Sequence, residues 1–261
     1  MRAWFKLNWS SKFVLLVEYD GTRYHGFQWQ AGVPTIQDEL ERAIGRICER
    51  SGRVMGASRT DAGVHAKGQV VSFWTNSSLE AATLVRAMNY YLPSDISVRA
   101  GYKSNDDFNV RRDASNREYR YYILNRPTRS PFSQRFALFS PGRLDVEAMR
   151  EGCRLLEGEH DFASFVPSLD DGRSTWRTVY DARVVEEGDF IVFRVVGNSF
   201  LPRQIRNMVG LLMRLGSGKM DLGDFRAIME ARCRGLAGPS SRACGLWLTR
   251  VNYPRSLGEG M

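Results

Sequence analysis

The stretch from Gly56 to Gln69 holds the residue types from which a catalytic site is most readily built. It contains three glycines, one carboxylate, one arginine and one histidine. In an extended chain Arg59 and Asp61 point to the same side, because side chains alternate with a period of two. A guanidinium beside a carboxylate lowers the pKa of the acid and keeps it ionised, ready to act as a nucleophile or a base. The stretch therefore predicts a shaped loop with Asp61 as the candidate catalytic group.

An ordinary surface turn is the competing interpretation of this loop. In it, Asp61 accepts backbone hydrogen bonds and Arg59 makes an exposed ion pair, since Asp and Gly are common turn residues. The literal string favours the catalytic interpretation. Residues 59–66, Arg-Thr-Asp-Ala-Gly-Val-His-Ala, are followed by Gly68-Gln69-Val70. Together they resemble the active-site motif of the TruA family of tRNA pseudouridine synthases.

Further strings resemble blocks of the same family in the same order along nearly the whole chain. They occupy residues 19–30, 108–121, 160–165, 174–177, 198–210 and 242–248. One departure is mild: Phe27 stands where the family more often has tryptophan, so the aromatic character is kept.

The resemblance assigns roles to particular side chains. Asp61 is the expected catalytic residue, Tyr119 lines its pocket, and Leu246 packs on the target base. Arg206 pairs with the catalytic aspartate, and Arg59 and Arg206 occupy the space that a flipped base leaves. As further RNA contacts we expect three cationic residues, namely Arg203, Arg111 and Lys67. Three chemical steps stay open for Asp61: attack at C1′, attack at C6, or removal of a sugar proton.

The same resemblance implies a substrate and partners. The expected substrate is uridine in the anticodon stem-loop of tRNA, at tRNA positions 38, 39 and/or 40, and the expected product is pseudouridine. The enzyme is expected to be a cytoplasmic homodimer that uses no metal or cofactor. Two competing functions follow from the residues alone. One is a non-catalytic basic RNA-binding module, and the other is a metal-free hydrolase with Asp61 as its nucleophile.

Composition independently favours a polyanionic partner. Lys and Arg number 37 against 29 Asp and Glu, which gives a net charge of +8 and a pI near 9.5. Between residues 203 and 255 the chain carries ten basic residues and three acidic ones. Such an excess suits binding to RNA phosphates. The four cysteines are scattered without a C-x-x-C pair, which predicts neither zinc nor disulfides and fits a reducing compartment. No apolar run is long enough to cross a bilayer.

Alternating strands and helices must position these residues. Strands are predicted at residues 12–19, 53–57, 69–74 and 96–102, with helices from Thr35 and after Ser77 or Ser78. The second half reads as a strand at 117–124, helices from Asp145 and Arg203, a hairpin over 175–196 and a last strand at 242–248. His160 and Asp161 are interpreted as structural, and Cys153 as a core residue.

This pattern predicts an α+β protein with mixed, mainly antiparallel sheets flanked by helices. We expect two similar lobes in a pseudo-twofold relation: residues 1–104, with the Asp61 loop, and residues 105–261, with the basic surface. The active-site cleft is expected between them.

Overall fold

The computed structural model describes residues 10–167 and 174–258. Internal contacts divide the chain into two compact units. Unit 1 comprises residues 1–115 and 250–261, and unit 2 comprises residues 116–249. The division from the sequence at residue 104 differs from this one, because residues 105–115 and 250–258 make their contacts with the first half. The pseudo-twofold relation and the cleft stay predictions.

Unit 1 is built on a small antiparallel sheet. Its strands are β1 (Ser11–Tyr19), β2 (Met55–Gly56), β3 (His65–Thr75) and β4 (Ile96–Lys103). β1 lies between β3 and β4, and β2 pairs with the other edge of β3. The fully buried side chains of Phe13, Val14 and Leu15 show why this apolar run forms the central strand. β3 begins four residues earlier than the predicted Gln69, because Ala66 already pairs with Tyr19 of β1.

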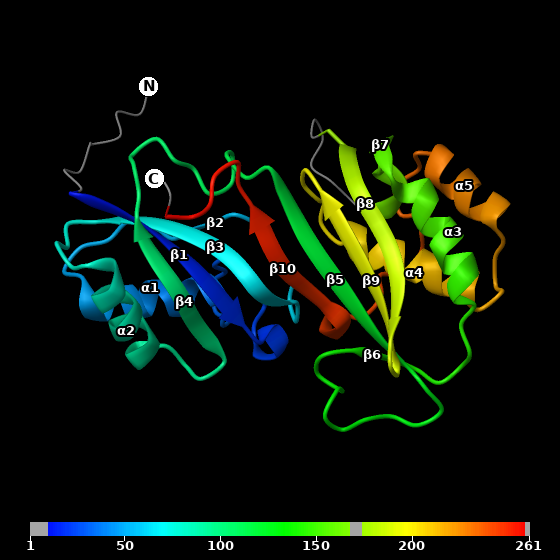
Figure 1. Cartoon of the computed structure of the whole chain (residues 1–261), viewed down its shortest axis with the longest axis horizontal. Coiled ribbons are helices and arrows are strands. Elements are labelled where there is room, and N and C mark those ends of the chain that lie inside the picture. Colours follow the sequence, from blue (N-terminus) through cyan, green and yellow to red (C-terminus); the bar gives the residue numbers. More distant parts are fainter. Residues whose placement is uncertain (1–9, 168–173, 259–261) are drawn as a thin grey trace. The chain divides into compact units, whose positions relative to one another are not determined.

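Two helices pack on this sheet (Figure 1). They are α1 (Ile36–Ile47) and α2 (Ala81–Tyr91), and α2 packs against both α1 and β4. Thr35 caps α1 as predicted, accepting a hydrogen bond from Asp38 N at 3.3 Å. The predicted serine cap of α2 is wrong: Glu80 occupies the cap position without a side-chain bond. Ser77 instead accepts from Leu79 N, which closes a local turn before the helix.

Unit 2 holds the remaining strands. They are β5 (Asn116–Asn125), β6 (Leu138–Ser140), β7 (Gly158–Asp161), β8 (Trp176–Glu187), β9 (Phe190–Gly197) and β10 (Leu246–Asn252), whose last residues, 250–252, count with unit 1. The strand order is β10-β5-β9-β8-β7, and β6 pairs in parallel with β5. The period of two predicted for β5 is confirmed. Tyr119, Tyr121 and Ile123 are buried, while Arg120 and Tyr122 on the other face are half-buried.

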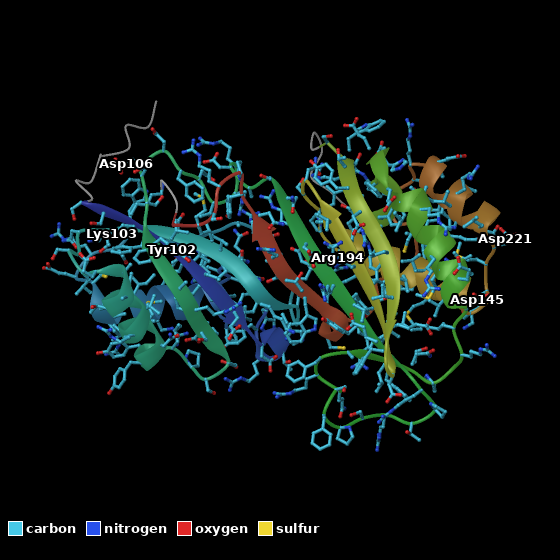
Figure 2. The ribbon with its side chains drawn as sticks, in the orientation of Figure 1. Tyr102, Lys103, Asp106, Asp145, Arg194 and Asp221 are labelled. Atoms are coloured by element: carbon cyan, nitrogen blue, oxygen red, sulfur yellow. The ribbon has the colours of Figure 1, made fainter. Side chains whose placement is uncertain are left out.

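Helices cover one face of the unit 2 strands (Figure 1). They are α3 (Val146–Leu156), α4 (Gln204–Gly216) and α5 (Leu222–Glu230). Asp145 and Asp221, both labelled in Figure 2, cap α3 and α5 by accepting from Ala148 N and Asp224 N. The other face carries charged side chains, among them Arg194 of β9, which is paired with Glu118 of β5 at 2.9 Å (Figure 2).

Short 3-10 turns complete the described chain. They are η1 (Gly21–Arg23), η2 (Ala163–Phe165) and η3 (Ala243–Gly245). Cys153 is buried on the core side of α3, as predicted. His160 and Asp161 make local contacts, since a His160 ring nitrogen lies 2.7 Å from Glu157 O and Asp161 accepts from Ala163 N. Within the described ranges, no helix combines the length and apolar character that a membrane span requires.

Candidate functional site

The predicted catalytic residue lies in a tight connection between β2 and β3. Asp61 O accepts a hydrogen bond from Val64 N at 3.1 Å, so the chain turns sharply at Ala62 and Gly63. Gly63 has a φ of 76°, a left-handed conformation that favours glycine. The Asp61 side chain is half-buried and that of Arg59 is exposed. The loop thus presents a carboxylate partly withdrawn from solvent at the first residue of a tight turn.

A buried polar network holds the chain on the N-terminal side of Asp61. The hydroxyls of Tyr19 and Thr60 lie 2.7 Å apart. Gln69 binds both backbone groups of Ser58: its Nε2 donates to Ser58 O at 2.6 Å and its Oε1 accepts from Ser58 N at 3.2 Å. The three side chains of Tyr19, Thr60 and Gln69 are all buried. Satisfied buried hydrogen bonds of this kind fix a single conformation, so the network sets the position of the loop.

Two glycines allow the chain after β1 to pass directly behind the loop. Gly26 has a φ of 96°, and a Cβ on it would lie 2.7 Å from Thr60 O. A Cβ on Gly21 would lie 2.0 Å from Val64 O. Phe27 N donates to Thr60 O at 3.0 Å, and Gly63 N donates to Tyr24 O at 3.2 Å. Backbone therefore packs against backbone on both sides of Asp61, an approach that only glycine permits.

His65 closes the C-terminal end of the loop. Its side chain is fully buried, and its Nδ1 accepts a hydrogen bond from Gly21 N at 3.1 Å. Asp20 Oδ1 lies 3.2 Å from the same nitrogen and accepts from Thr22 N. His65 therefore fastens the start of β3 to η1.

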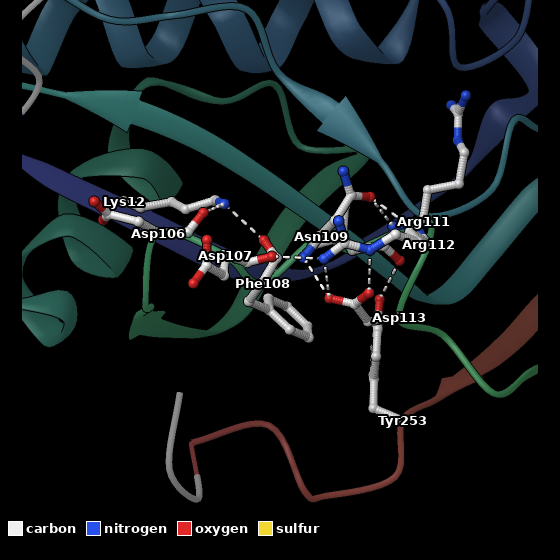
Figure 3. Close-up of polar contacts among 10 residues, drawn as sticks. Lys12, Asp106, Asp107, Phe108, Asn109, Arg111, Arg112, Asp113 and Tyr253 are labelled. Carbon is white, nitrogen blue, oxygen red and sulfur yellow. Dashed lines mark hydrogen bonds and ion pairs between the residues drawn. The ribbon is translucent and has the colours of Figure 1, made fainter.

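The cationic candidates of unit 1 differ in how they are held. Arg59, Lys67 and Arg111 are all exposed. Arg111 also donates to Gly56 O at 3.3 Å, at the start of the segment that leads to Asp61. Its own turn is rigid, since Asn109 Oδ1 accepts from the backbone N–H groups of Arg111 and Arg112 at 3.0 Å (Figure 3). Arg111 is thus tied to the Asp61 loop as well as exposed to solvent.

Unit 2 holds the predicted base-contacting residues. Tyr119 is buried on β5, and its ring meets that of Phe200 edge to face with centroids 5.5 Å apart. Leu246 is buried and opens β10 directly after η3. Gly245 precedes it, where a Cβ would lie 2.6 Å from the Tyr121 ring. This close approach fixes where the Leu246 side chain begins.

Arg206 is anchored to the segment that precedes η3. Its Nε donates to Ser241 O at 2.7 Å, and Ser241 N donates to Arg206 O at 3.1 Å. The next residue, Asn207, is buried and binds both Ser240 and Phe165 O. Arg203 is exposed and has a φ of 60°, because it lies at the left-handed start of α4. The guanidinium of Arg206 is therefore oriented by the backbone, whereas that of Arg203 extends into solvent.

The structure thus groups the predicted residues in two sets. Asp61, Arg59 and Arg111 gather around the loop of unit 1, and Tyr119, Arg206 and Leu246 belong to unit 2. Sequence reasoning assigned no role to Tyr19, Gln69 and His65, although all three lie in strings that resemble the family. In the described ranges, no group of three or more His, Cys, Asp or Glu side chains is arranged to hold a metal ion.

Comparison with known proteins gives consistent matches. The family model described as tRNA pseudouridine synthase matches residues 15–112 and 153–254, which include the Asp61 loop, Arg206 and Leu246. The tRNA pseudouridine synthase A of Exiguobacterium sibiricum is 40% identical over 245 residues, which cover 94% of this chain and 98% of that protein. The tRNA pseudouridine synthase A of Francisella tularensis subsp. tularensis is 38% identical over 242 residues, 93% of this chain and 94% of that protein.

Proposed function

The chain belongs to the tRNA pseudouridine synthase family, and we propose that it converts uridine to pseudouridine in the anticodon arm of tRNA with Asp61 as its catalytic residue. Enzymes with this activity are isomerases. The observation that carries the assignment of Asp61 is its placement: a half-buried carboxylate on a loop held by the buried Tyr19, Thr60 and Gln69 side chains. A reacting group must be held this firmly to lower a barrier.

The reaction itself balances without a redox partner. The N1–C1′ bond of uridine breaks, the base turns, and a C5–C1′ bond forms. The proton leaves C5 and N1 gains one, so the product has the same atoms as the substrate. What the protein must supply is access to a stacked base, a group that promotes bond cleavage, and a pocket that retains the free base during its rotation.

Asp61 supplies the group that promotes cleavage. An ionised carboxylate acts as a nucleophile at C1′ or at C6 of the base, or as a base toward a sugar proton. Each of these roles needs the carboxylate to lie against the target nucleoside. The tight turn at Ala62 and Gly63 supports this assignment because it fixes the backbone directly after Asp61.

The base is held by residues of unit 2 in this proposal. Tyr119 contacts the flipped uracil by stacking or edge to face, and Leu246 packs on the same base. Such aromatic and apolar contacts compensate for the base stacking that is lost when the base leaves the helix. Arg206 interacts with the negative charge of Asp61 or of a phosphate, and its bond to Ser241 O supports a fixed orientation. Further phosphate contacts come from the exposed cationic residues Arg59, Arg203, Arg111 and Lys67.

Replacing the carboxylate tests the assignment. Asp61→Asn keeps the shape of the side chain and removes its charge, so pseudouridine formation on an unmodified tRNA transcript should be abolished while tRNA affinity is largely kept. Asp107→Asn, an exposed acid of the same unit, serves as the matched control and should retain activity. Product formation by Asp61→Asn at the wild-type rate would remove Asp61 from the mechanism. Binding without product in the wild type would favour a non-catalytic RNA-binding module.

We further propose that two copies act together on tRNA in the cytoplasm. The net charge of +8 supports a surface able to bind an extended polyanion. Light scattering of the purified protein should give twice the chain mass of 29.7 kDa. A mass of one chain, with full activity, would contradict this part of the proposal.

A further inference from the structure

The connection between β5 and β6 has an unusual composition. This β5–β6 loop, residues 126–137, reads Arg-Pro-Thr-Arg-Ser-Pro-Phe-Ser-Gln-Arg-Phe-Ala and contains three arginines and no acidic residue. It projects away from the strands of unit 2 as the long green segment beside β6 in Figure 1. With twelve residues it is about twice as long as the usual connection between elements of a compact protein.

Both ends of the β5–β6 loop are firmly anchored. At the first end, Arg126 pairs with Asp189 at 2.9 Å and donates to Thr128 O at 2.8 Å. At the second, Trp247 Nε1 donates to Phe136 O at 3.1 Å, and the Cys244 thiol contacts Ala137 O at 3.6 Å. Both ends of the loop are therefore fixed to other parts of unit 2.

The second anchor adjoins the candidate base-binding position. Cys244 and Trp247 are the partners of the loop, and Leu246 lies between them in the sequence. Leu246 is the residue to which we assign packing on the target base. The second anchor therefore lies at the same end of β10 as Leu246.

The middle of the loop exposes an aromatic ring. The side chain of Phe132 is 91% exposed, more than that of any other large hydrophobic residue in the described ranges. Arg129 and Arg135 on either side of it are exposed as well. A phenylalanine left in water forgoes the favourable free energy of burying its side chain. A solvated aromatic flanked by cations is the combination that binds unpaired nucleotides.

We propose that the β5–β6 loop is an RNA-binding element, in which Phe132 stacks on an unpaired base and Arg129 and Arg135 contact phosphates on either side of it. This inference rests on the proposed function, because it takes tRNA as the ligand. Charge selects RNA over a second copy of the chain as the occupant. A second copy of this chain carries a net charge of +8, whereas the phosphates of RNA carry the negative charge that the three arginines of the loop attract.

Binding of an unmodified tRNA transcript, measured by filter binding, tests the loop. Phe132→Ala should raise the Kd by about 5- to 150-fold, the range expected for the loss of one base stacked on an aromatic ring. Phe132→Trp, which keeps a stacking surface, should restore affinity. For Arg129→Ala, the slope of log Kobs against log salt concentration should become less negative by about 0.7. This is the change expected when one phosphate contact to a single strand is lost.

Tyr90→Ala is the matched control, since Tyr90 is an 82% exposed aromatic of unit 1 to which we assign no RNA contact. Its Kd should equal that of the wild type. An unchanged Kd in Phe132→Ala would overturn the proposal. A halved molar mass of Phe132→Ala in light scattering would also overturn it, and would assign the loop to an interface between copies.

The outcome is separable from that of the proposed function. The Kd for tRNA is measured without turnover, so the effect of Phe132→Ala on binding is read independently of pseudouridine formation. A wild-type protein that binds tRNA but forms no pseudouridine would defeat the proposed function while leaving the role of the loop intact.

Discussion

The hydroxyl of Tyr19 lies 2.7 Å from Oγ1 of Thr60, and this hydrogen bond joins residues 41 positions apart in the sequence. Tyr19 ends β1, the central strand of unit 1, and Thr60 directly precedes Asp61. The bond therefore ties the position of the Asp61 loop to the central strand of the unit. Because Gln69 of β3 holds Ser58 as well, two strands fix the same short segment.

Removing this bond should impair catalysis more than binding. Thr60→Val keeps the volume of the side chain and loses its hydroxyl, so Asp61 is no longer held in one position. We expect kcat to fall by up to about 100-fold, as small misplacements of a catalytic group do, with little change in the Kd for tRNA. Thr60→Ser keeps the hydroxyl and should retain most of the activity. A kcat of Thr60→Val equal to that of the wild type would show that the bond does not position Asp61.

Gly26 offers a test of the close backbone approach behind the loop. Gly26→Ala should destabilise the protein in two ways, by strain at a φ of 96° and by contact of the new Cβ with Thr60 O. Strain alone costs about 1–2 kcal/mol. Gly32→Ala isolates that strain, because Gly32 has a φ of 77° and a Cβ added to it would meet no atom within 4 Å. Urea unfolding should show the larger loss for Gly26→Ala, together with a loss of kcat that Gly32→Ala lacks. Equal losses in the two variants would argue against a tight contact.

The charged face of unit 2 should make stability depend on acid pH. Burial alone would raise the pKa of Glu118, but the hydrogen bonds and charges of Arg194 and Arg120 outweigh it and hold that pKa below its ordinary value. A depressed pKa in the folded state stabilises the protein above the unfolded-state pKa, and this stabilisation is lost as the pH falls through the folded-state pKa.

Arg194→Gln should therefore cost more stability at pH 7 than at pH 3, as measured by urea unfolding at both pH values. Arg154→Gln, which removes a 69% exposed guanidinium 3.7 Å from Glu147, should change stability little at either pH. A loss in Arg194→Gln that is the same at pH 3 and pH 7 would exclude Glu118 as the titrating group.

The cysteines should differ sharply in reactivity. Burial raises the pKa of the Cys153 thiol to about 12, whereas Cys233 is exposed. Since the thiolate is the reactive form, a thiol reagent such as DTNB at pH 8 should label Cys233 quickly and Cys153 only after unfolding. Cys233→Ser should abolish the fast phase of labelling. A fast phase that persists in this variant would show that another thiol, such as that of the half-buried Cys244, reacts in the folded state.

Local patterns predicted most of the fold. The stripe of Ile36, Leu40 and Ile44 behind the Thr35 cap defines α1, and the alternation around Tyr119 defines β5. α5 was not predicted, because Phe225 is its one buried side chain and the sequence therefore shows only a weak amphipathic pattern. β6 and β7 have three and four residues, and such short strands depend on partners that are distant in the sequence.

The candidate site was predictable only in part for the same reason. The string around Asp61 points to the candidate catalytic residue by itself, because its residues are adjacent. The bonds from Tyr19 to Thr60 and from His65 to Gly21 depend on the register between β1 and β3, which no local pattern specifies. The anchoring of Arg206 by Ser241 is equally non-local.

The membership of residues 250–258 in unit 1 has a consequence for how the protein is made. Asn252 O accepts from Ser115 N, and the Tyr253 hydroxyl donates to Val110 O at 2.7 Å. Residues 105–115 therefore find these partners only after residues 252 and 253 have been synthesised. The half that carries Asp61 is translated first, yet it completes its native contacts last.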